Sequence, residues 1–477
     1  MTPLRWIAKF RLVLALLVVV GLNQAVDHGQ TARPRRIAVF GSSVANGSGD
    51  EYKKEGYTGL LRELMAPRGW QVLNQSRGGD TTIKIAPRFT PEGTPDPNTR
   101  YLLPVNPGYV VIGLSLANEG IWEAKTKEDK DAIYKQYADG IKSLIDRARQ
   151  NNIVPIVALC YPRMVYTPVE YEYVRRINLL HNSWDVPSVN FPGALDDGTG
   201  RYTLGFDFDD KHPNAMGHRE FLYTFVPTLF EALEQGKPTP SRPAKAKGFA
   251  RIAADTSPLM FAPQDTMHPF AVSLMVRAQS DGTVVAVGGS TLSAKVEMKK
   301  GDAVDAKEFE EITLSADRTF SATIGVQAGK WTYKSANGTS VASLVSADAR
   351  WHHVVLSHYT ARGETLFYVD GELSGTVAER LQPTQFVIGG PGAAGSPAAP
   401  KQADYKDVYI FRAALNADEV AVLNEGKVLQ ASLEIYSPLT DSQFQPNSTA
   451  ENRAQSMTGL KIGSARIKHI EEPGATN

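Results

Sequence analysis

The chain of 477 residues contains a single cysteine, Cys160, and its 51 Lys and Arg residues are balanced by 51 Asp and Glu residues. One thiol cannot form an internal disulfide, so the stability of the protein must come from the size of its hydrophobic core. The lack of net charge gives no support for binding to nucleic acid or to a membrane surface. Cys160 ends the apolar run 153–160, which favours a small buried side chain over a reactive thiol.

One apolar run stands out near the start of the chain, at residues 12–22, directly after Arg5, Lys9 and Arg11. A basic start, a short apolar segment and a small residue such as Ala25 are typical of a secretory signal peptide. The run is short for the ~30 Å of a bilayer core, so a permanent membrane anchor is the weaker interpretation. Residues 1–25 are therefore predicted to be a signal peptide, and the protein is expected to be secreted or periplasmic.

The length suggests two or three domains, and the first is expected at residues 36–236. Short apolar runs alternate there with amphipathic stretches, which indicates an α/β fold with a parallel sheet covered on both faces. Strands are predicted at 37–40, 70–74, 109–114 and 153–160, and helices at 59–65, 133–148, 169–184 and 214–233. Ligands bind beyond the carboxyl ends of such strands, and Ser43, Gly79 and Asn118 each follow a predicted strand closely.

Residues 237–249 are rich in proline and lysine and are predicted to form a linker. Beyond them the pattern changes to short alternating strands, so residues 250–437 are predicted to be an all-β sandwich. Strands are expected at 270–276, 283–287, 320–324, 352–357 and 365–369, and one more is considered at 430–437. Residues 438–477 are expected to be a C-terminal extension that is partly loose.

A possible nucleophilic site is spread over four segments of the first domain. Asp209 lies three residues before His212 and could hold that imidazole in one tautomer, so that the histidine could take a proton from Ser43. The backbone amide of Gly79 and the side chain of Asn118 could donate hydrogen bonds to a developing oxyanion. Each residue alone has an ordinary role, such as a turn or a helix N-cap, and only the combination favours catalysis.

Other histidines compete with His212 as the base. His218 is the nearest competitor, but it falls inside the predicted final helix, where capping or packing is the expected role. His181 lies in the middle of a predicted helix, and His352 and His353 lie on a predicted sandwich strand, so all three are interpreted as structural.

Taken in chain order, four segments of the first domain resemble the sequence blocks of the SGNH or GDSL hydrolase superfamily of esterases and lipases. They are Gly41-Ser42-Ser43, Gly79, Leu116-Ala117-Asn118-Glu119 and Asp209-Asp210-Lys211-His212. The resemblance implies a flavodoxin-like α/β/α three-layer fold, with Ser43 as nucleophile, His212 as general base and then general acid, and Asp209 orienting His212. It also implies an oxyanion hole formed by the amides of Ser43 and Gly79 and the side chain of Asn118, with no metal or organic cofactor.

The chain departs from the family pattern at three positions. Ser42 replaces the usual aspartate, Leu116 a glycine and Glu119 an aspartate. These changes leave substrate preference open, and they keep Ser42 as an alternative nucleophile.

The second domain resembles a laminin-G-like or concanavalin A-like jelly roll. The resemblance rests on residues 351–356, 365–373, 386–390 and 407–415. Domains of this kind bind sugars or proteins, or only pack against a neighbour, so the fold does not fix the role.

The preferred interpretation is a secreted serine carboxylic-ester hydrolase acting on a small-molecule or polysaccharide ester, with removal of acetyl groups from a carbohydrate as its reaction. The sugar part of this interpretation rests on the expected export and on the lectin-like neighbour, which could also bind glycan. One alternative is a short-chain lipase, lysophospholipase or arylesterase that uses the same residues. Another is a non-catalytic glycan-binding or adhesion protein with a decayed esterase domain. No nucleic-acid partner and no stable membrane span are expected.

Overall fold

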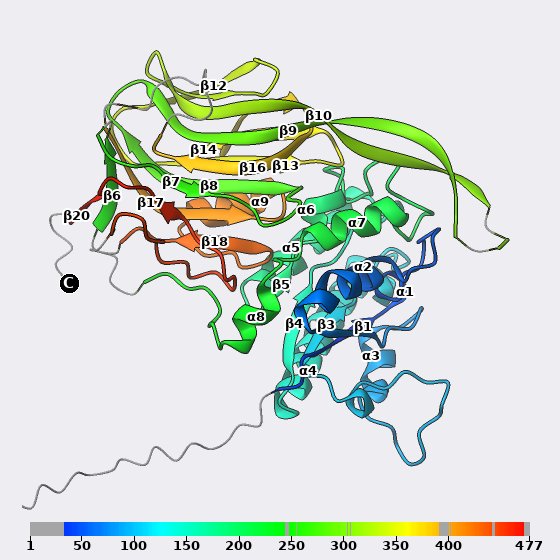
Figure 1. Ribbon diagram of the computed structural model, residues 1–477. Helices are drawn as coiled ribbons and strands as arrows, with labels where there is room; N and C mark the ends of the chain where they lie inside the picture. Colours follow the sequence, from blue (N-terminus) through cyan, green and yellow to red (C-terminus); the bar gives the residue numbers. More distant parts are fainter. Residues whose placement is uncertain are drawn as a thin grey trace, which may run out of the picture.

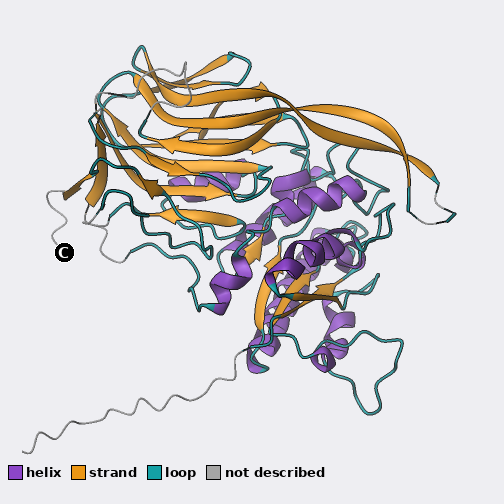
Figure 2. Cartoon of the chain, viewed as in Figure 1, coloured by secondary structure: helices purple, strands orange, loops and turns teal. Residues whose placement is uncertain are grey.

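The computed structural model describes residues 33–243, 248–253, 255–302, 304–305, 307–390, 400, 402–440 and 444–471. Figure 1 shows an α/β body formed by the first half of the chain and a β-sandwich formed by the second half, packed side by side. The coloring in Figure 2 makes the difference plain, because helices gather in the first body and strands dominate the second. The predicted signal peptide lies outside the described residues. Within them, no helix has both the length and the apolar character needed to cross a membrane.

The first body is built on a parallel sheet of five strands in the order β2-β1-β3-β4-β5. This is the strand order of a flavodoxin-like fold, in which ligands bind at the point where the strand order reverses. The strands are continuously apolar because both faces of the sheet are covered, as the sequence predicts. Their bounds are Arg36–Gly41, Gln71–Asn74, Tyr109–Gly113, Val154–Ala158 and Ser188–Val189 for β1 to β5.

Helices cover the two faces of this sheet in separate layers. One face packs against α2 (Gly56–Met65), α7 (Ala215–Tyr223) and α8 (Leu229–Glu234). The other packs against α3 (Thr82–Ile85), α4 (Lys127–Gln150) and α5 (Pro168–Asn182). The short helices α1 (Ser43–Asn46) and α6 (Pro192–Leu195) complete this body, together with the 3-10 turns η1 (Ala66–Arg68), η2 (Ala86–Phe89), η3 (Leu103–Val105) and η4 (Leu116–Glu119).

The predicted helix at 214–233 is wrong as a single element. The side chain of Asn214 caps the start of α7 by accepting a hydrogen bond from the amide of Gly217. Helix α7 ends at Tyr223, and α8 starts only at Leu229. Pro227 lies between the two helices and has no amide hydrogen to continue a helical ladder, which accounts for the break.

The second body is a sandwich of two antiparallel sheets. One has the order β12-β11-β10-β9-β16-β7-β19, and the other has the order β15-β14-β13-β8-β17-β6-β20, with β18 also paired to β17. Its strands are β6 (Gly248–Ala253), β7 (Leu259–Phe261), β8 (Phe270–Ala278), β9 (Gly282–Lys300), β10 (Glu308–Gln327), β11 (Lys330–Lys334), β12 (Ser340–Ser346), β13 (His352–Tyr359), β14 (Glu364–Val369), β15 (Glu372–Ala378), β16 (Leu381–Ile388), β17 (Gln402–Phe411), β18 (Leu433–Ser437), β19 (Lys461–Ile462) and β20 (Lys468–Glu471). Helix α9 (Ala417–Asn424) follows β17.

Several elements differ from the prediction. Strand β6 begins at Gly248, inside the segment predicted as linker. The extension after residue 437, predicted to be partly loose, contains two strands that were not predicted, because β19 and β20 each add an outer strand to one of the two sheets. The strands expected at 283–287 and 320–324 are the inner parts of much longer ones, β9 and β10, with 19 and 20 residues. The outer part of β9 continues the alternation of apolar and polar residues over 292–298, so the predicted strand was too short at this end.

The two bodies meet through buried polar contacts. The side chain of Asn190 donates to Glu419 at 2.8 Å, and the amide of Asn190 donates to the Ser432 hydroxyl at 2.8 Å. The Nδ1 atom of His268 in the second body lies 3.0 Å from a carboxylate oxygen of Glu220 in the first, and both side chains are buried. Because buried polar groups are stable only when they are paired, these contacts fix the relative position of the two bodies.

Candidate active site

The turn after β1 places Ser43 beyond the carboxyl end of this strand, which lies between β2 and β3 in the sheet. Gly41 ends β1, and a Cβ atom added to it would lie 2.2 Å from the carbonyl oxygen of Gly113 on the adjacent strand. Helix α1 starts at Ser43, and Ala45 packs against both glycines. Only small residues allow this close approach of α1 to the two strand ends. Ser43 is half-buried, so its hydroxyl group stands at the edge of the sheet that the sequence predicts as the site.

The histidine comes from the loop before α7. The Nε2 atom of His212 lies 2.9 Å from the Oγ atom of Ser43, although 169 residues separate them in the chain. The Nδ1 atom of His212 lies 2.9 and 3.0 Å from the two carboxylate oxygens of Asp209. With Nδ1–H donating to Asp209, Nε2 is free to accept the Ser43 proton, which is the tautomer that a general base needs.

Asp209 also shapes the turn that carries His212. Its Oδ1 atom accepts hydrogen bonds from the amides of Lys211 at 2.7 Å and His212 at 2.9 Å. Partial burial alone would raise the pKa of Asp209, but the hydrogen bonds from the His212 side chain and from these amides outweigh it and lower the pKa. The carboxylate therefore stays ionised and can hold the Nδ1 proton of His212.

The glycine segment passes directly beside the serine. A Cβ atom added to Gly78 would lie 3.8 Å from the Cβ atom of Ser43. Gly79 has φ +80°, a conformation that glycine adopts without strain, and an added Cβ atom would meet nothing within 4 Å. The space beside Gly79 is therefore open to a substrate.

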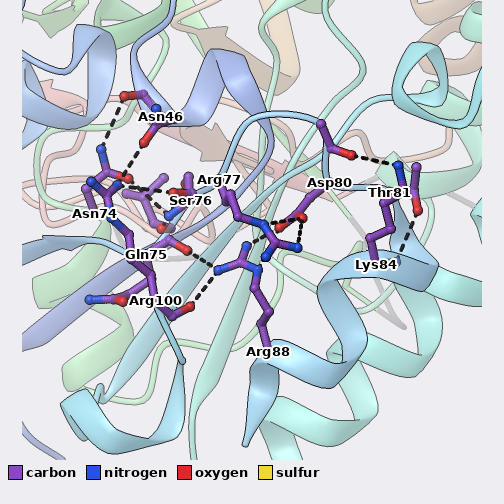
Figure 3. A network of polar contacts seen from close by, with 12 residues as sticks. Asn46, Asn74, Gln75, Ser76, Arg77, Asp80, Thr81, Lys84, Arg88 and Arg100 are labelled. Carbon is purple, nitrogen blue, oxygen red and sulfur yellow. Dashed lines mark hydrogen bonds and ion pairs between the residues drawn. The ribbon is translucent and has the colours of Figure 1, made fainter. Parts of the chain in front are cut away.

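A network of charged and polar side chains holds this glycine segment, as Figure 3 shows. The Asp80 carboxylate is fully buried, and the guanidinium groups of Arg77 and Arg88 both bind it. Arg88 also donates to the carbonyl oxygens of Gln75 at 2.9 Å and Arg100 at 2.5 Å. Each guanidinium donates two hydrogen bonds to one oxygen of Asp80, Arg77 to Oδ1 and Arg88 to Oδ2, and charge-assisted bonds of this kind hold the backbone on both sides of Gly79 in place.

The same network reaches the helix that carries the serine. Arg100 donates to the side-chain oxygen of Asn46, the last residue of α1, at 2.8 Å. Asn74 donates to the backbone carbonyl of Asn46 at 3.4 Å. The serine turn and the glycine segment are thus parts of one connected polar structure (Figure 3).

Asn118 is oriented by hydrogen bonds to its oxygen atom. Its Oδ1 atom accepts from the amide of Ser115 at 2.9 Å and from the hydroxyl of Tyr161 at 3.3 Å. The amide nitrogen of the side chain has no hydrogen-bond partner among the described residues and so remains available to a ligand. The backbone amides of Ser43 and Gly79 likewise donate to no described residue. All three candidate donors are therefore unused among the residues that the structure describes.

The family departures have distinct structural outcomes. Ser42 is completely buried, and its hydroxyl has no hydrogen-bond partner among the described residues, whereas the Ser43 hydroxyl meets His212. This geometry favours Ser43 over Ser42 as the nucleophile. Glu119 is long enough to accept a hydrogen bond from the amide of Thr82 at 2.6 Å, which joins the Asn118 turn to the start of α3.

His218 is built into the support of the site instead of competing with His212. Its Nε2 atom lies 2.9 Å from the Ser48 carbonyl, and its Nδ1 atom accepts from the amide of Tyr57 at 3.3 Å. Burial lowers the pKa of His218 to about 4, so it is neutral at pH 7 and can make both bonds at once.

The other groups that the sequence sets aside are also built into the core. His181 is fully buried in α5 and its pKa is lowered by burial to about 3. His352 contacts Asp348 and Asp370, and His353 contacts Ser273. Burial raises the pKa of the Cys160 thiol, whose sulfur accepts from the amide of Leu116 at 3.2 Å. No cluster of three or more His, Cys, Asp or Glu side chains suited to a metal ion occurs in the described parts of the chain.

The residues that support the site are not among those predicted from the sequence. Asp80 follows Gly79 directly, and an aspartate within a glycine turn is a weak signal that could have been noticed. Arg88 and Tyr161 gave no signal, because an arginine in a short helix and a tyrosine after a strand are common. The partners of Arg88 lie 8 to 13 residues away and the partner of Tyr161 lies 43 residues away, and no local pattern pairs them before the chain folds.

A flavodoxin-like sheet with a Ser–His–Asp arrangement at its carboxyl edge defines this part of the chain as a serine hydrolase type of α/β domain. Residues 39–220 match the GDSL-like lipase/acylhydrolase family, and residues 274–421 match the concanavalin A-like lectin/glucanases superfamily. The chain thus carries a GDSL-like ester-bond hydrolase domain followed by a concanavalin A-like domain. No curated protein matches the sequence.

Solved structures that resemble the chain include proteins of both kinds. A lipolytic protein of the G-D-S-L family from Desulfitobacterium hafniense is 20% identical, with a TM-score of 0.31, over 39% of this chain and 95% of that chain. An acetyl xylan esterase from Geobacillus stearothermophilus is 16% identical, with a TM-score of 0.31, over 39% of this chain and 91% of that chain. A carbohydrate-binding protein from Bacteroides ovatus is 16% identical, with a TM-score of 0.31, over 50% of this chain and 64% of that chain.

Proposed function

We propose that this protein is an exported serine esterase that removes acetyl groups from a carbohydrate. The observation that carries the proposal is the 2.9 Å contact between the Ser43 hydroxyl and the imidazole of His212, whose other nitrogen meets Asp209. These are the distances at which a serine is activated by a histidine base.

In the proposed reaction, Ser43 Oγ attacks the ester carbonyl and His212 Nε2 takes its proton. The carbonyl oxygen becomes an oxyanion and accepts hydrogen bonds from the Ser43 and Gly79 amides and from the Asn118 side chain. The intermediate then expels the alcohol, which leaves with the proton from His212, and the acyl group stays on Ser43. Water repeats the same steps with His212 as the base, and the carboxylic acid is released. Asp209 stabilises the imidazolium form of His212 in both halves.

The polar surroundings of Ser43 support a carbohydrate as the alcohol. Arg77 and Lys84 are exposed on the glycine side of the site, and hydroxyl groups of a sugar could bind to such donors. On the histidine side, the ammonium group of Lys211 lies over the ring of Trp122, 5.9 Å from its centre, and this cation is a further donor for sugar hydroxyl groups. The concanavalin A-like domain adds support by association, because lectins share its fold.

A second candidate is a short-chain lipase, lysophospholipase or arylesterase with the same residues. The observation in its favour is that Leu204 and Phe208, near His212 in the chain, are 85% and 55% exposed. Exposed apolar side chains at this position could contact the apolar part of a lipid or aryl ester.

Hydrolysis of p-nitrophenyl acetate by the wild type and by Ser43→Ala tests the catalytic part of the proposal. Ser43→Ala is expected to lose at least about 10³-fold in kcat, while the matched variant Ser42→Ala stays within a few fold. Equal rates in wild type and Ser43→Ala would overturn the proposal and favour a glycan-binding protein. Rates on acetylated xylan, acetylated pectin and short-chain lipid esters then separate the two candidate substrate classes.

Export rests on the basic and apolar pattern of residues 1–25. Expression of the full chain followed by mass spectrometry of the protein outside the cytoplasm is the direct test. A mature N-terminus shortly after Ala25 is expected, and a full-length cytoplasmic product would contradict export.

A further inference from the structure

Strands β9 and β10 extend beyond the sandwich as a two-stranded ribbon. The neighbouring strand β16 pairs with β9 only as far as Thr291, and β11 pairs with β10 only from Thr323 onward. Outside these paired regions, residues 293–300 of β9 pair with residues 308–315 of β10. We call these two segments the arm. Figure 1 shows the arm leaving the sandwich and running past α7 toward the loop that follows α1. A ribbon of two strands is marginally stable alone, so its position depends on what it contacts.

The arm makes its first contact with the loop 47–55. Tyr52 in this loop donates a hydrogen bond to Glu311, and its ring packs edge-on against Phe309 with 5.6 Å between ring centres. Glu311 is only 6% exposed, although it lies on a ribbon that projects from its domain. At the tip of the ribbon, Lys54 and Asp302 form an exposed ion pair at 3.1 Å.

The second contact is with the loop that leads to His212. A Cβ atom added to Gly205 would lie 2.2 Å from the Cδ1 atom of Ile312, so the backbone of the loop and this side chain are in close contact. Ile312 also packs against the hydrophobic core under α2 and α7. Its cross-strand partner Val296 is 59% exposed and has no such role.

Both contacted loops are joined to the segment around His212. A Cβ atom added to Gly49 in the Tyr52 loop would lie 2.1 Å from the Pro213 carbonyl and 3.0 Å from the His212 Cβ atom. From the other side, the carbonyl of Gly205 accepts from the side chain of Asn214 at 2.8 Å. The arm therefore holds the two loops that enclose the histidine turn.

We propose that the arm is a positioning element for His212, so that the second domain contributes to the geometry of the hydrolase site. Tyr52, Glu311 and Ile312 are positioning residues, because none of them reaches Ser43 or His212 directly. This inference rests on the proposed esterase function and adds that the site needs both domains. Small displacements of a base relative to its nucleophile cost large factors in rate, so loosening of the two loops lowers kcat.

The experiment measures p-nitrophenyl acetate hydrolysis by the full chain, because this substrate is too small to need the arm for binding. In one variant, Ala294 is joined to Leu314, its cross-strand partner, through an Asn-Gly turn, which removes the outer part of the arm. The concentration of active sites is titrated with a fluorophosphonate that labels Ser43. We expect kcat per active site to fall at least 10-fold, with KM changed less than threefold.

Point variants keep the test decisive if the shortened chain fails to fold. Tyr52→Ala and Ile312→Ala are expected to lower kcat about fivefold or more, and Tyr52→Phe, which keeps the contact with Phe309 but leaves the buried Glu311 without this hydrogen bond, is expected to lower it less than Tyr52→Ala. The matched controls Val296→Ala and Glu310→Gln change exposed neighbours on the arm and should leave kcat unchanged.

Failure of the positioning role can be distinguished from failure of the proposed esterase function. Loss of activity in Ser43→Ala together with an unchanged kcat in Tyr52→Ala, Ile312→Ala and the shortened arm would overturn the positioning role and leave the esterase intact. Wild-type activity equal to that of Ser43→Ala would instead overturn the proposed function itself. An effect confined to KM would also contradict positioning, because it would place the arm in substrate binding.

Discussion

The two sides of the candidate active site are supported by different parts of the molecule. On the donor side, the hydrolase domain alone holds Gly79 and Asn118, through the buried Asp80 and Arg88 pair and the hydroxyl of Tyr161. On the base side, His212 stands on a turn whose Asp209 side chain is 44% exposed, and the loops around this turn contact the arm of the second domain.

This difference indicates which side of the active site can change its geometry more easily. A buried ion pair is costly to break, because the remaining charge is left without a partner. Exposed contacts such as Lys54 with Asp302 contribute little one at a time. The donor side is therefore expected to be rigid, and the base side to respond to changes in the second domain.

The largest effect is expected on the base side, from Asp209→Asn. The asparagine oxygen can still accept from the backbone amides of the turn, but its amide group would face His212 Nδ1 and favour the wrong tautomer. A loss of about 10⁴-fold in kcat is expected. Steady-state kinetics with p-nitrophenyl acetate measures it, and the exposed neighbour Asp210→Asn serves as the control. A loss below about 10-fold would remove Asp209 from the proposed mechanism.

On the donor side, Asp80→Asn is expected to act on stability. The change leaves the buried Arg88 without its carboxylate, and about 3–5 kcal/mol of unfolding free energy should be lost. Urea denaturation followed by fluorescence is the measurement. Arg77→Ala, whose side chain is 49% exposed, is the control and should cost below about 1 kcal/mol. Similar costs for both variants would show that the donor side is no more rigid than the base side.

Removing an oxyanion-hole donor tests the donor side through catalysis instead of stability. Asn118→Ala is expected to lower kcat by about 10²–10³-fold, with little change in stability, because the donated hydrogen bond strengthens in the transition state. Tyr161→Phe removes only a hydroxyl that orients Asn118 and should lose less than about 10-fold. If Tyr161→Phe were the more damaging change, the assigned orientation of Asn118 would be wrong.

The buried Glu419, which contacts Asn190 across the interface between the two bodies, should make stability sensitive to pH. Burial raises the pKa of Glu419 from 4.5 to about 7, against the effect of hydrogen bonds from Asn416 and Asn190. The folded protein then keeps a proton that the unfolded chain releases, so this group makes stability fall as the pH rises from 4.5 to about 7. The fall corresponds to about 3 kcal/mol at most. Thermal unfolding at pH 5 and pH 8 should show a smaller pH effect in Glu419→Gln than in wild type, and an equal effect would contradict this assignment.

Much of the hydrolase fold could be predicted because its signals are local. The apolar runs that became β1, β3 and β4 lie within a few residues of their predicted bounds, since strands covered on both faces must be apolar throughout. The predicted site residues each follow a strand or a turn, and the structure brings Ser43, His212 and Asp209 together. The roles of these residues remain predictions until the variants are measured.

The contacts between the arm and the hydrolase domain could not be predicted, because they join residues that are far apart in the sequence. Tyr52 is an ordinary loop residue in the sequence, and Glu311 lies in a charged stretch that resembles a solvated strand. Only the fold brings them together across 259 residues. The short strand β5 was missed for a related reason, since two residues carry no periodicity.

The two outer strands that follow residue 437 have a consequence for work with fragments. Cutting the chain at the predicted end of the sandwich would remove β19 and β20 and leave the backbone edges of β7 and β6 unpaired. Unprotected strand edges recruit strands from other molecules, so such a fragment is expected to self-associate even though every residue of its predicted domain is present.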